Sequence, residues 1–366
     1  MKLCYIDNVA THYRKAIFLL IDQTFECDYL FGESLGDIKQ MDTSLLKGNV
    51  MKTKTYKWHG WYWQKGVVSK LWKPYDRYIL IGETRALSTW TFCLLARFTG
   101  KSRRVFFWSH GWYGKETWLE RAIKKVQFHL PGGGIFLYGN YARGLMIKEG
   151  FNPDKLFTIH NSLDYDNQLT LRQKQQPTAI YRDHFSNDGK NLIFVGRLTP
   201  IKKLDMVLEA LADCNNRGEK YNMTFIGDGE KKDDLMTLTH QLGLEQQVWF
   251  YGACYDENKL SELIYNADLC VAPGNVGLTA MHALVFGTPV ITHNNFPYQM
   301  PEFESIHEGE TGAFFEQDNI VSLSAAISNW FETHKDREIV RNNCYKEIDE
   351  QWTPQFQIEV LKKNLA

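Results

Sequence analysis

The chain alternates between short runs of apolar residues and longer stretches in which apolar residues recur every three or four positions. Short runs are typical of buried strands, and the longer spacing is typical of amphipathic helices. In the first half, the expected strands are 2–7, 77–82, 105–110, 134–138 and 156–160, and the expected helices are 13–23, 84–98, 115–129 and 141–149. The segment 50–72 fits neither period, and we interpret it as an aromatic loop or a broken helix.

The alternation restarts with greater regularity after a polar, Gln-rich stretch. The expected strands are 191–195, 223–226, 248–251, 269–272 and 289–292, and the expected helices are 203–215, 231–242, 257–266, 278–286 and 320–333. This order predicts two parallel sheets with helices on both faces, the Rossmann-like α/β architecture. The expected parts are a first domain (1–165), a linker (166–190), a second domain (191–335) and C-terminal helices (336–366) that cross back to the first domain.

Length and composition fit a soluble protein of two domains. The chain has 366 residues, of which 44% are hydrophobic and 23% are charged. No apolar run is long enough to span a membrane, and Met1 leads directly into a predicted strand rather than a signal peptide. The seven cysteines are scattered without a C-x-x-C pair, which indicates buried thiols in a reducing cytoplasm rather than a metal site.

Charge is distributed unevenly between the two halves. Residues 1–165 contain 24 Lys and Arg against 14 Asp and Glu, a net charge of +10, and the remainder carries −11. Eight of the eleven Trp also lie in residues 1–165. Trp, Lys and Arg together favour a lipid headgroup layer, so an anionic membrane is a candidate partner, with Lys101, Arg103, Arg104, Lys124 and Lys125 among the cations. The alternative is an ordinary solvated surface, and nothing indicates a nucleic-acid partner.

Two cations follow the first strand of the second half, in Gly196-Arg-Leu-Thr-Pro-Ile-Lys-Lys-Leu-Asp205. Arg197 and Lys202 lie between a strand end and a helix start. Cations at a helix N-terminus oppose the helix dipole unless an anion is bound there. Arg offers a planar fork of donors, and Lys offers a mobile charge. We therefore favour a diphosphate-binding role for the pair over the alternative that both are solvated surface cations.

A second candidate phosphate site lies in residues 271–291. A short strand leads into a turn with Gly274 and Gly277, and a helix then begins near Leu278. Backbone N–H groups at such a turn suit a phosphate, although a plain β-α-β unit would have the same pattern. A third glycine turn, Ile226-Gly-Asp-Gly-Glu230, would let a nucleotide approach the backbone at Gly227.

Taken in order, these segments resemble the nucleotide-binding half of GT-B glycosyltransferases, in particular family 4, also described as glycosyl transferases group 1. The resemblance is strongest from 191 to about 315. It rests on Phe194–Asp205, Ile226–Glu230, Trp249–Gly252, Tyr265–Pro273, Gly287–Ile291 and Glu308–Gly312. The first half matches more loosely, through Ser109–Gly111 and Thr158–Asp164.

The resemblance implies two Rossmann-like domains that face a central cleft, and transfer of a sugar from a nucleotide diphosphate sugar to an acceptor hydroxyl. The donor would be a UDP- or GDP-sugar, and the acceptor a glycan or lipid-linked glycan bound by the first domain. Arg197 and Lys202 would neutralise the leaving diphosphate without a metal or other cofactor. His110 would face the donor sugar, unless it is a structural histidine in an aromatic pocket. Gly196, Gly277, Leu278 and Thr279 would contact the phosphates, and Tyr255 would flank the base.

The sequence departs from the family at two carboxylates. Family members carry two Glu residues where this chain has Gly274 and His282. His282 could bond a ribose hydroxyl or pack under the loop, and Asn275 could bond a sugar hydroxyl. Glu302 and Glu304, on a loop after a strand, could supply the missing negative charge. The family implies retention at the anomeric carbon, but these substitutions leave the outcome open.

Three functions fit this pattern. One is a hexosyltransferase of surface polysaccharide or glycolipid synthesis, cytoplasmic and peripheral at the inner face of the plasma membrane. Another is a non-catalytic protein that binds nucleotide sugars or glycans, which would explain the lost Glu pair. The third is a GT-B sugar-nucleotide epimerase. The presence of Arg197 and Lys202 favours the transferase, because a protein without turnover needs no clamp for a leaving group.

Overall fold

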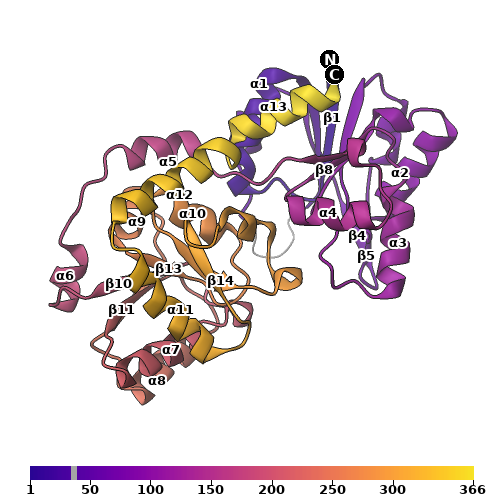
Figure 1. The fold of residues 1–366 in the computed structure, drawn as a ribbon. Coiled ribbons are helices and arrows are strands. Elements are labelled where there is room, and N and C mark those ends of the chain that lie inside the picture. The colour runs from indigo at the N-terminus through magenta and orange to yellow at the C-terminus, as the bar shows by residue number, and fades with distance from the viewer. Residues whose placement is uncertain (34–38) are drawn as a thin grey trace. The chain divides into compact units, whose positions relative to one another are not determined.

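A computed structural model describes residues 1–33 and 39–366 and divides the chain into two compact units. Unit 1 comprises Met1–Tyr165 and Trp352–Ala366, and unit 2 comprises Asp166–Gln351. Each unit contains its own parallel sheet (Figure 1). The stretch 166–190, where we predicted a linker, contains two helices, α5 (Tyr165–Arg172) and α6 (Ile180–Phe185).

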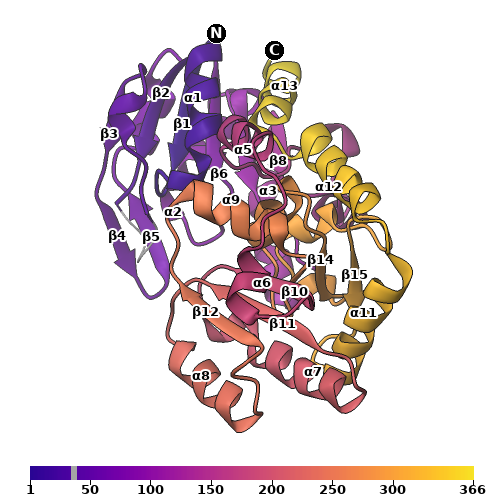
Figure 2. The same ribbon diagram turned by 90° about the vertical axis from the view of Figure 1, so that its left-hand side faces the viewer.

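The sheet of unit 1 has seven parallel strands in the order β3-β2-β1-β6-β7-β8-β9. Figure 2 shows β3 at one edge, followed by β2 and β1. The strands are β1 (Lys2–Asp7), β2 (Glu26–Phe31), β3 (Val50–Lys52), β6 (Arg77–Ile81), β7 (Val105–Ser109), β8 (Gly134–Leu137) and β9 (Leu156–Thr158). The interior strand β7, between β6 and β8, is buried along its whole length, as expected where helices cover both faces of a parallel sheet.

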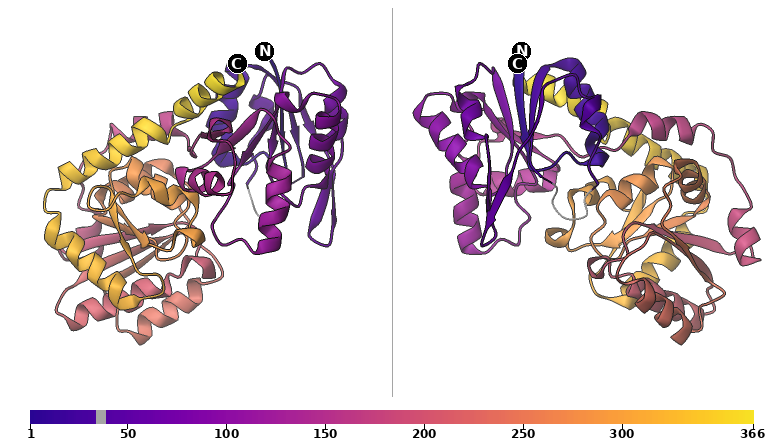
Figure 3. Two further views of the ribbon diagram at one scale, coloured as in Figure 1. Left: turned by 45° about the vertical axis from the view of Figure 1, so that its right-hand side comes forward. Right: turned by 180° about the vertical axis from the view of Figure 1, so that it is seen from behind.

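Helices pack on both faces of this sheet (Figure 3). One core cluster joins α1 and α13 to the sheet, and the other joins α2, α3 and α4 to the opposite face. The helices are α1 (Lys15–Thr24), α2 (Leu87–Phe98), α3 (Trp118–Phe128), α4 (Asn140–Lys148) and α13 (Pro354–Leu365). The last segment of the chain therefore belongs to unit 1, where Ile358 and Leu361 enter the same core as Ile17 and Phe18.

The interpretation of 50–72 as a loop or broken helix is wrong. This segment forms β3, an antiparallel hairpin of β4 (Thr55–Trp58) and β5 (Trp61–Gln64), and the 3-10 helix η3 (Val68–Trp72). His59 and Gly60 form the hairpin turn with φ of 45° and 82°, the conformation that two-residue hairpin turns require. The strand β2 was also missed, because Glu26 and Asp28 interrupt its apolar run.

The sheet of unit 2 has six parallel strands in the order β12-β11-β10-β13-β14-β15. They are β10 (Lys190–Val195), β11 (Tyr221–Ile226), β12 (Val248–Gly252), β13 (Leu269–Val271), β14 (Val290–His293) and β15 (Gly312–Phe315). The helices are α7 (Asp205–Asn216), α8 (Lys232–Gln241), α9 (Glu257–Asn266), α10 (Leu278–Val285), α11 (Ile320–Thr333) and α12 (Arg337–Gln351). β11 is buried at all six positions, including the polar residues Asn222 and Thr224.

Candidate functional site

The order of strands in unit 2 has a switch point between β10 and β13. We call the loops that leave the carboxyl ends of these two strands the β10–β13 crevice. From β10 the chain continues to β11 and β12 on one side, whereas β13, β14 and β15 lie on the other. The chain therefore leaves β10 and β13 toward opposite sides of the sheet, and open parallel sheets bind their ligands at such switch points. Arg197 and Lys202 lie on the loop after β10, and Gly274 and Asn275 lie on the loop after β13.

Gly274 brings these two loops into contact. Its N–H group donates a hydrogen bond to the carbonyl oxygen of Lys202 at 3.0 Å. A Cβ atom at position 274 would lie 2.1 Å from the carbonyl oxygen of Ile201 and 2.7 Å from Cα of Lys202. The approach of the loops therefore requires glycine at this position.

Lys202 is a largely buried cation of the crevice. Its Nζ atom donates to the carbonyl oxygen of Asn275 at 2.6 Å and to Oδ1 of the same residue at 2.8 Å. Burial lowers the pKa of Lys202 to about 8; the negative charge of Glu302 opposes this shift, and the positive charge of Arg197 adds to it. Because these hydrogen bonds go to neutral oxygens, the charge of Lys202 remains available to an anion. Asn275 thus positions Lys202, a role that the sequence did not suggest.

The glycines after β10 and β11 allow two loops to interlock. A Cβ atom on Gly227 would lie 1.9 Å from the carbonyl oxygen of Gly196, and one on Gly229 would lie 2.4 Å from that of Leu198. All three glycines have φ between 148° and 155°. The close approach of a nucleotide to Gly227 stays a prediction; the structure shows that the glycines let the two loops approach each other closely. Arg197, between Gly196 and Leu198 on the first of these loops, is exposed.

The N-terminus of α10 adds backbone donors to the crevice. Gly277 is the N-cap, with φ of 51° and no side-chain cap, and Leu278 and Thr279 open the helix. The hydroxyl of Thr279 donates to the carbonyl oxygen of Val195 at 2.9 Å, which ties α10 to the end of β10. The first N–H groups of a helix have no partner within it, so this end of α10 can receive an anion next to Lys202, whose Nζ would lie 3.8 Å from a Cβ on Gly277.

Gln299 joins the loop after β13 to the strand β14, and the sequence pattern did not predict this role. Its Oε1 atom accepts the N–H of Val276 at 2.9 Å, and its Nε2 atom donates to Oγ1 of Thr292 at 2.8 Å and to the carbonyl oxygen of His293 at 3.0 Å. Gln299 is 3% exposed. The only sequence signal was a polar residue in the proline-flanked segment 297–301, which does not reveal that its partners lie on other loops.

The remaining predicted donor residues lie in different environments. Glu302, on the 3-10 helix η8 (Pro301–Ser305), is buried and close enough to raise the pKa of Lys202. Glu304 is half-buried on the same helix. Tyr255 is 87% exposed on the loop after β12. The structure thus relates Glu302 to Lys202 through its negative charge.

Unit 1 has its own switch point, between β1 and β6. A cavity of about 410 Å³ lies at the carboxyl ends of β1, β6, β7 and β8, and Asn8, Glu83, His110 and Tyr138 are among its lining residues. This volume is within the range of about 300–1,000 Å³ for small-molecule sites. The cavity therefore places His110 in a ligand-sized site at the position that the topology favours.

His110 is a neutral side chain held between two aromatic rings. Its ring lies 4.6 Å from that of Tyr138 and 5.9 Å from that of Tyr113. Burial lowers the pKa of His110 to about 4, and the charges of Arg14 and Lys124 act in the same direction. Its Nδ1 atom is buried and makes no hydrogen bond to any residue that the structure describes. His110 can therefore bond a neutral ligand but contributes no positive charge near pH 7.

Sequence comparison identifies the family of unit 2. The model of the family described as glycosyl transferases group 1 matches residues 178–347, which include every element around the β10–β13 crevice. These residues form a glycosyl transferases group 1 domain. An uncharacterized glycosyltransferase of Methanocaldococcus jannaschii is 25% identical over 204 residues. D-inositol 3-phosphate glycosyltransferase 2 of Catenulispora acidiphila is 29% identical over 155 residues.

The match with the M. jannaschii protein covers 55% of this chain and 51% of that protein, and the match with the C. acidiphila protein covers 39% and 35%. The chain therefore spans about half, or less, of the length of these relatives. Solved structures resemble it over its full length. Anabaena HepE in complex with UDP has a TM-score of 0.72 at 16% identity, with 99% of both chains covered. The lipopolysaccharide outer core galactosyltransferase WaaB has a TM-score of 0.72 at 14% identity, covering 100% of this chain and 99% of that chain. The two Rossmann-like units thus have the GT-B fold.

The group 1 domain has Gly274 and His282 at the two positions where the family resemblance implies glutamates. The structure explains the absence of a side chain at one of them, position 274. Gly274 has no room for a side chain, because the Ile201–Lys202 backbone occupies that space. His282 is half-buried in the second turn of α10, and burial lowers its pKa to about 4. Its Nδ1 atom makes no hydrogen bond within the described part of the chain. The neutral ring of His282 can exchange a hydrogen bond with a ligand, but it cannot replace a carboxylate charge.

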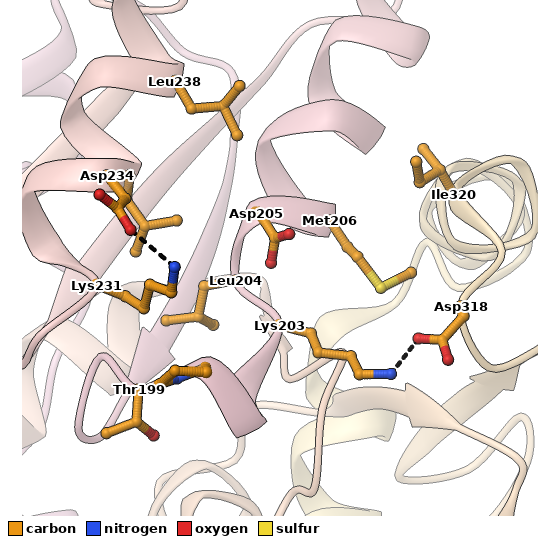
Figure 4. Close-up of a pocket in the computed structure, with 12 residues that line it drawn as sticks. Thr199, Lys203, Leu204, Asp205, Met206, Lys231, Asp234, Leu238, Asp318 and Ile320 are labelled. Atoms are coloured by element: carbon orange, nitrogen blue, oxygen red, sulfur yellow. Dashed lines mark hydrogen bonds and ion pairs between the residues drawn. The ribbon is translucent and has the colours of Figure 1, made fainter.

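The group 1 domain has a second recess, of about 550 Å³, that contains none of the predicted donor-binding residues (Figure 4). It lies between the starts of α7, α8 and α11. Lys203 is paired there with Asp318, and Lys231 with Asp234 at 2.7 Å. Asp205 adds a further negative charge to the wall. Because both lysines are already neutralised, this recess is poorly suited to a diphosphate, and the β10–β13 crevice is the better site.

Two further observations concern metals and membranes. Among residues 1–33 and 39–366, no group of three or more His, Cys, Asp or Glu side chains could hold a metal ion. No helix in these same ranges has the length and apolar character needed to cross a membrane.

Proposed function

We propose that the chain transfers a hexosyl group from a nucleotide diphosphate sugar to an acceptor hydroxyl. The observation that carries this proposal is the contact between the loops after β10 and β13, which places Lys202 beside the N-terminus of α10. Two donor types, a half-buried cation and backbone N–H groups, thereby converge on one anion site. HepE of Anabaena, which has the same fold, has been solved with UDP and with UDP-glucose, and this supports a nucleotide-sugar donor.

Arg197 and Lys202 stabilise the diphosphate as its negative charge grows during cleavage of the bond to the anomeric carbon. Charge stabilisation of this kind is often the largest catalytic contribution. With two cations and a helix N-terminus at the leaving group, the reaction requires no metal. His110, a neutral hydrogen-bonding group of unit 1, contributes to the binding of the reacting sugars. Retention at the anomeric carbon is the proposed outcome, and NMR of the anomeric proton in the product tests it.

The proposed setting is synthesis of a surface polysaccharide or glycolipid at the inner face of the plasma membrane. WaaB, which shares the fold, is a lipopolysaccharide outer core galactosyltransferase. On unit 1, large apolar side chains are exposed on α2, α3 and the β4–β5 hairpin, including Phe98, Trp118 and Trp58 at 85%, 80% and 71%. Exposed Arg103, Arg104 and Lys125 belong to the same unit. Aromatic and cationic side chains together favour an anionic headgroup layer.

The test is turnover of a panel of UDP- and GDP-sugars by the wild-type chain and by Arg197→Ala and Lys202→Ala, with and without EDTA. We expect each substitution to lower kcat by about 100-fold or more, the range seen when one charge-stabilising donor is removed. EDTA should leave the wild-type rate unchanged. Lys231→Ala, which removes a cation of the same domain outside the crevice, is the matched control. Unchanged turnover in both crevice variants contradicts the assignment.

A further inference from the structure

The cavity that contains His110 is lined by two carboxylates, Asp7 and Glu83. These two side chains differ in their hydrogen-bond and ion-pair partners. Asp7, at the end of β1, is 3% exposed. Its carboxylate accepts hydrogen bonds from Nη1 of Arg14 at 3.0 Å, from the N–H of Asn8 at 2.7 Å and from the hydroxyl of Tyr5 at 3.3 Å. The charge of Asp7 is therefore neutralised by the buried Arg14, and its carboxylate already accepts three hydrogen bonds. We assign Asp7 a structural role rather than a ligand-binding one.

Glu83, just after β6, is held by neutral groups. Its Oε2 atom accepts a hydrogen bond from the hydroxyl of Tyr62 at 2.7 Å and another from Nδ2 of Asn8 at 3.3 Å. Within residues 1–33 and 39–366, Glu83 forms no ion pair and its Oε1 atom accepts no hydrogen bond. Glu83 is half-buried and lines the cavity. One oxygen is thus fixed in place. Two cations, Arg14 and Lys124, line the same cavity, but each is paired with another carboxylate, Asp7 at 3.0 Å and Glu116 at 2.6 Å respectively. Neither forms an ion pair with Glu83, so its negative charge is the one that remains in excess.

The sheet register places Glu83 and His110 next to each other. Ile81 of β6 pairs with Trp108 of β7. Glu83 lies two residues after Ile81, and His110 lies two residues after Trp108, so the two residues occupy equivalent positions on neighbouring strand ends. The hydroxyl of Ser109 donates to the carbonyl oxygen of Gly82 at 2.7 Å, which holds the two strand ends together. Neighbouring parallel strands lie about 4.8 Å apart. The carboxylate and the neutral imidazole therefore line adjacent parts of one cavity wall.

The chemistry of this wall selects against anions. An uncompensated carboxylate repels phosphate and carboxylate groups but accepts hydrogen bonds from hydroxyls. The Tyr138 and Tyr113 rings beside His110 provide apolar surface for the C–H groups of a sugar ring. We propose that Glu83 binds a hydroxyl of the acceptor and that this cavity takes a neutral sugar or polyol ring rather than a phosphate or a uronic acid. This inference rests on the proposed glycosyltransferase function and names the class of its acceptor.

The β4–β5 hairpin holds Glu83 in position. Tyr62 lies on β5, and its backbone N–H donates to the carbonyl oxygen of Arg85 at 2.9 Å. The hairpin therefore contacts the loop 82–85 through both the backbone and the side chain of Tyr62. Because Tyr62 and Asn8 can also donate to an amide oxygen, Glu83→Gln keeps both hydrogen bonds while removing the charge, which makes it a conservative test variant.

The experiment measures binding of small glycosides to the full chain by NMR titration at pH 7.5. The probes are the methyl glycosides of glucose, galactose and N-acetylglucosamine, and methyl glucuronide. We expect the wild type to bind at least one neutral glycoside tenfold or more tightly than the glucuronide. Glu83→Gln should reduce this preference to threefold or less, whereas Glu83→Asp should keep it. Glu26→Gln, an exposed glutamate of the same unit outside the cavity, is the matched control.

Two results overturn the inference: no neutral glycoside binds the wild type, or Glu83→Gln keeps the full preference. UDP and GDP binding is measured on the same samples. Failure of the wild type to bind either nucleotide contradicts the proposed function itself. Intact nucleotide binding with negative glycoside results contradicts only the role of Glu83, and intact nucleotide binding in each variant also shows that it is folded.

Discussion

At the scale of single residues, the properties of the crevice follow from contacts between loops that are distant in sequence. Arg197 and Lys202 were predictable, because cations between a strand end and a helix start oppose the helix dipole unless an anion binds there. The hydrogen bonds of Lys202 to Asn275 were not, since they join residues 73 positions apart. Gln299 was unpredictable for the same reason. A motif indicates which residues carry charge, but the packing of other loops determines how that charge is held.

The first residue-scale prediction concerns pH. Because burial lowers the pKa of Lys202 to about 8, its positive charge is present below pH 8 and is lost as pH rises. Affinity for UDP or GDP should therefore fall, relative to its value at pH 7.5, by up to about tenfold per pH unit above 8. Calorimetric titration measures this. Lys202→Arg, which stays charged, should remove the dependence; a flat profile for the wild type up to pH 9.5 contradicts the prediction.

The second residue-scale prediction concerns Gly274. Gly274→Ala places a Cβ 2.1 Å from the carbonyl oxygen of Ile201, so the loops must separate. We expect a loss of roughly 1–3 kcal/mol of stability, together with weaker nucleotide binding. Urea denaturation and nucleotide titration provide the two readouts. Gly144→Ala, in α4 with no atom near the new Cβ, is the control and should be neutral or slightly stabilising.

At the scale of elements, periodicity located most helices and most parallel strands, including short ones such as β9 and β13, but it did not reveal the β4–β5 hairpin. Strand β1 matches its prediction at both ends. The four-residue strands β4 and β5 are too short to establish a period, and their many aromatic residues obscured the alternation. Helix α3 was predicted from 115, but it begins at Trp118 because Thr117 and Glu120 form a capping box. Side-chain caps determine such ends, which periodicity alone does not locate.

The capping box gives an element-scale prediction. The Oγ1 atom of Thr117 accepts the N–H of Glu120 at 3.3 Å, and Oε2 of Glu120 accepts the N–H of Thr117 at 2.8 Å. Thr117→Ala should cost about 1 kcal/mol and speed amide exchange in the first turn of α3. Hydrogen exchange with mass spectrometry measures this. Thr91→Ala, within α2, should leave α3 unchanged; equal protection of α3 in the wild type and Thr117→Ala would show that the cap is dispensable.

At the scale of the whole molecule, the net charge is positive in residues 1–165 and negative in the rest of the chain. The five cations that the sequence suggested for membrane contact are not equivalent. Lys124 and Lys101 are half-buried: Lys124 is paired with Glu116 at 2.6 Å, and Lys101 donates to the carbonyl oxygen of Leu71 at 2.8 Å. Arg103, Arg104 and Lys125 remain exposed. The structure therefore narrows the cations of the proposed membrane surface to three.

This surface gives the whole-molecule prediction. Each cation near an anionic bilayer contributes about 1 kcal/mol, so replacing Arg103, Arg104 and Lys125 together by Glu should weaken binding to phosphatidylglycerol vesicles by tenfold or more. Co-sedimentation measures the effect. Lys220, Lys231 and Lys232 of unit 2, replaced together by Glu, form the control and should change binding little. Equal binding of the unit 1 variant and the wild type to the vesicles would contradict the proposed membrane contact of unit 1.

The close approach at Gly274 also bears on how this site can change during evolution. A single substitution to Glu would restore the residue type of the family but would force its side chain into the Ile201–Lys202 backbone. The loop after β10 would have to move first, and that movement would displace Lys202 from Asn275. Each step alone harms the crevice, so a single substitution cannot place a glutamate at position 274 without rearranging the loop after β10. Descendants of this chain are therefore expected to adjust donor binding through other positions, such as Glu302 and His282.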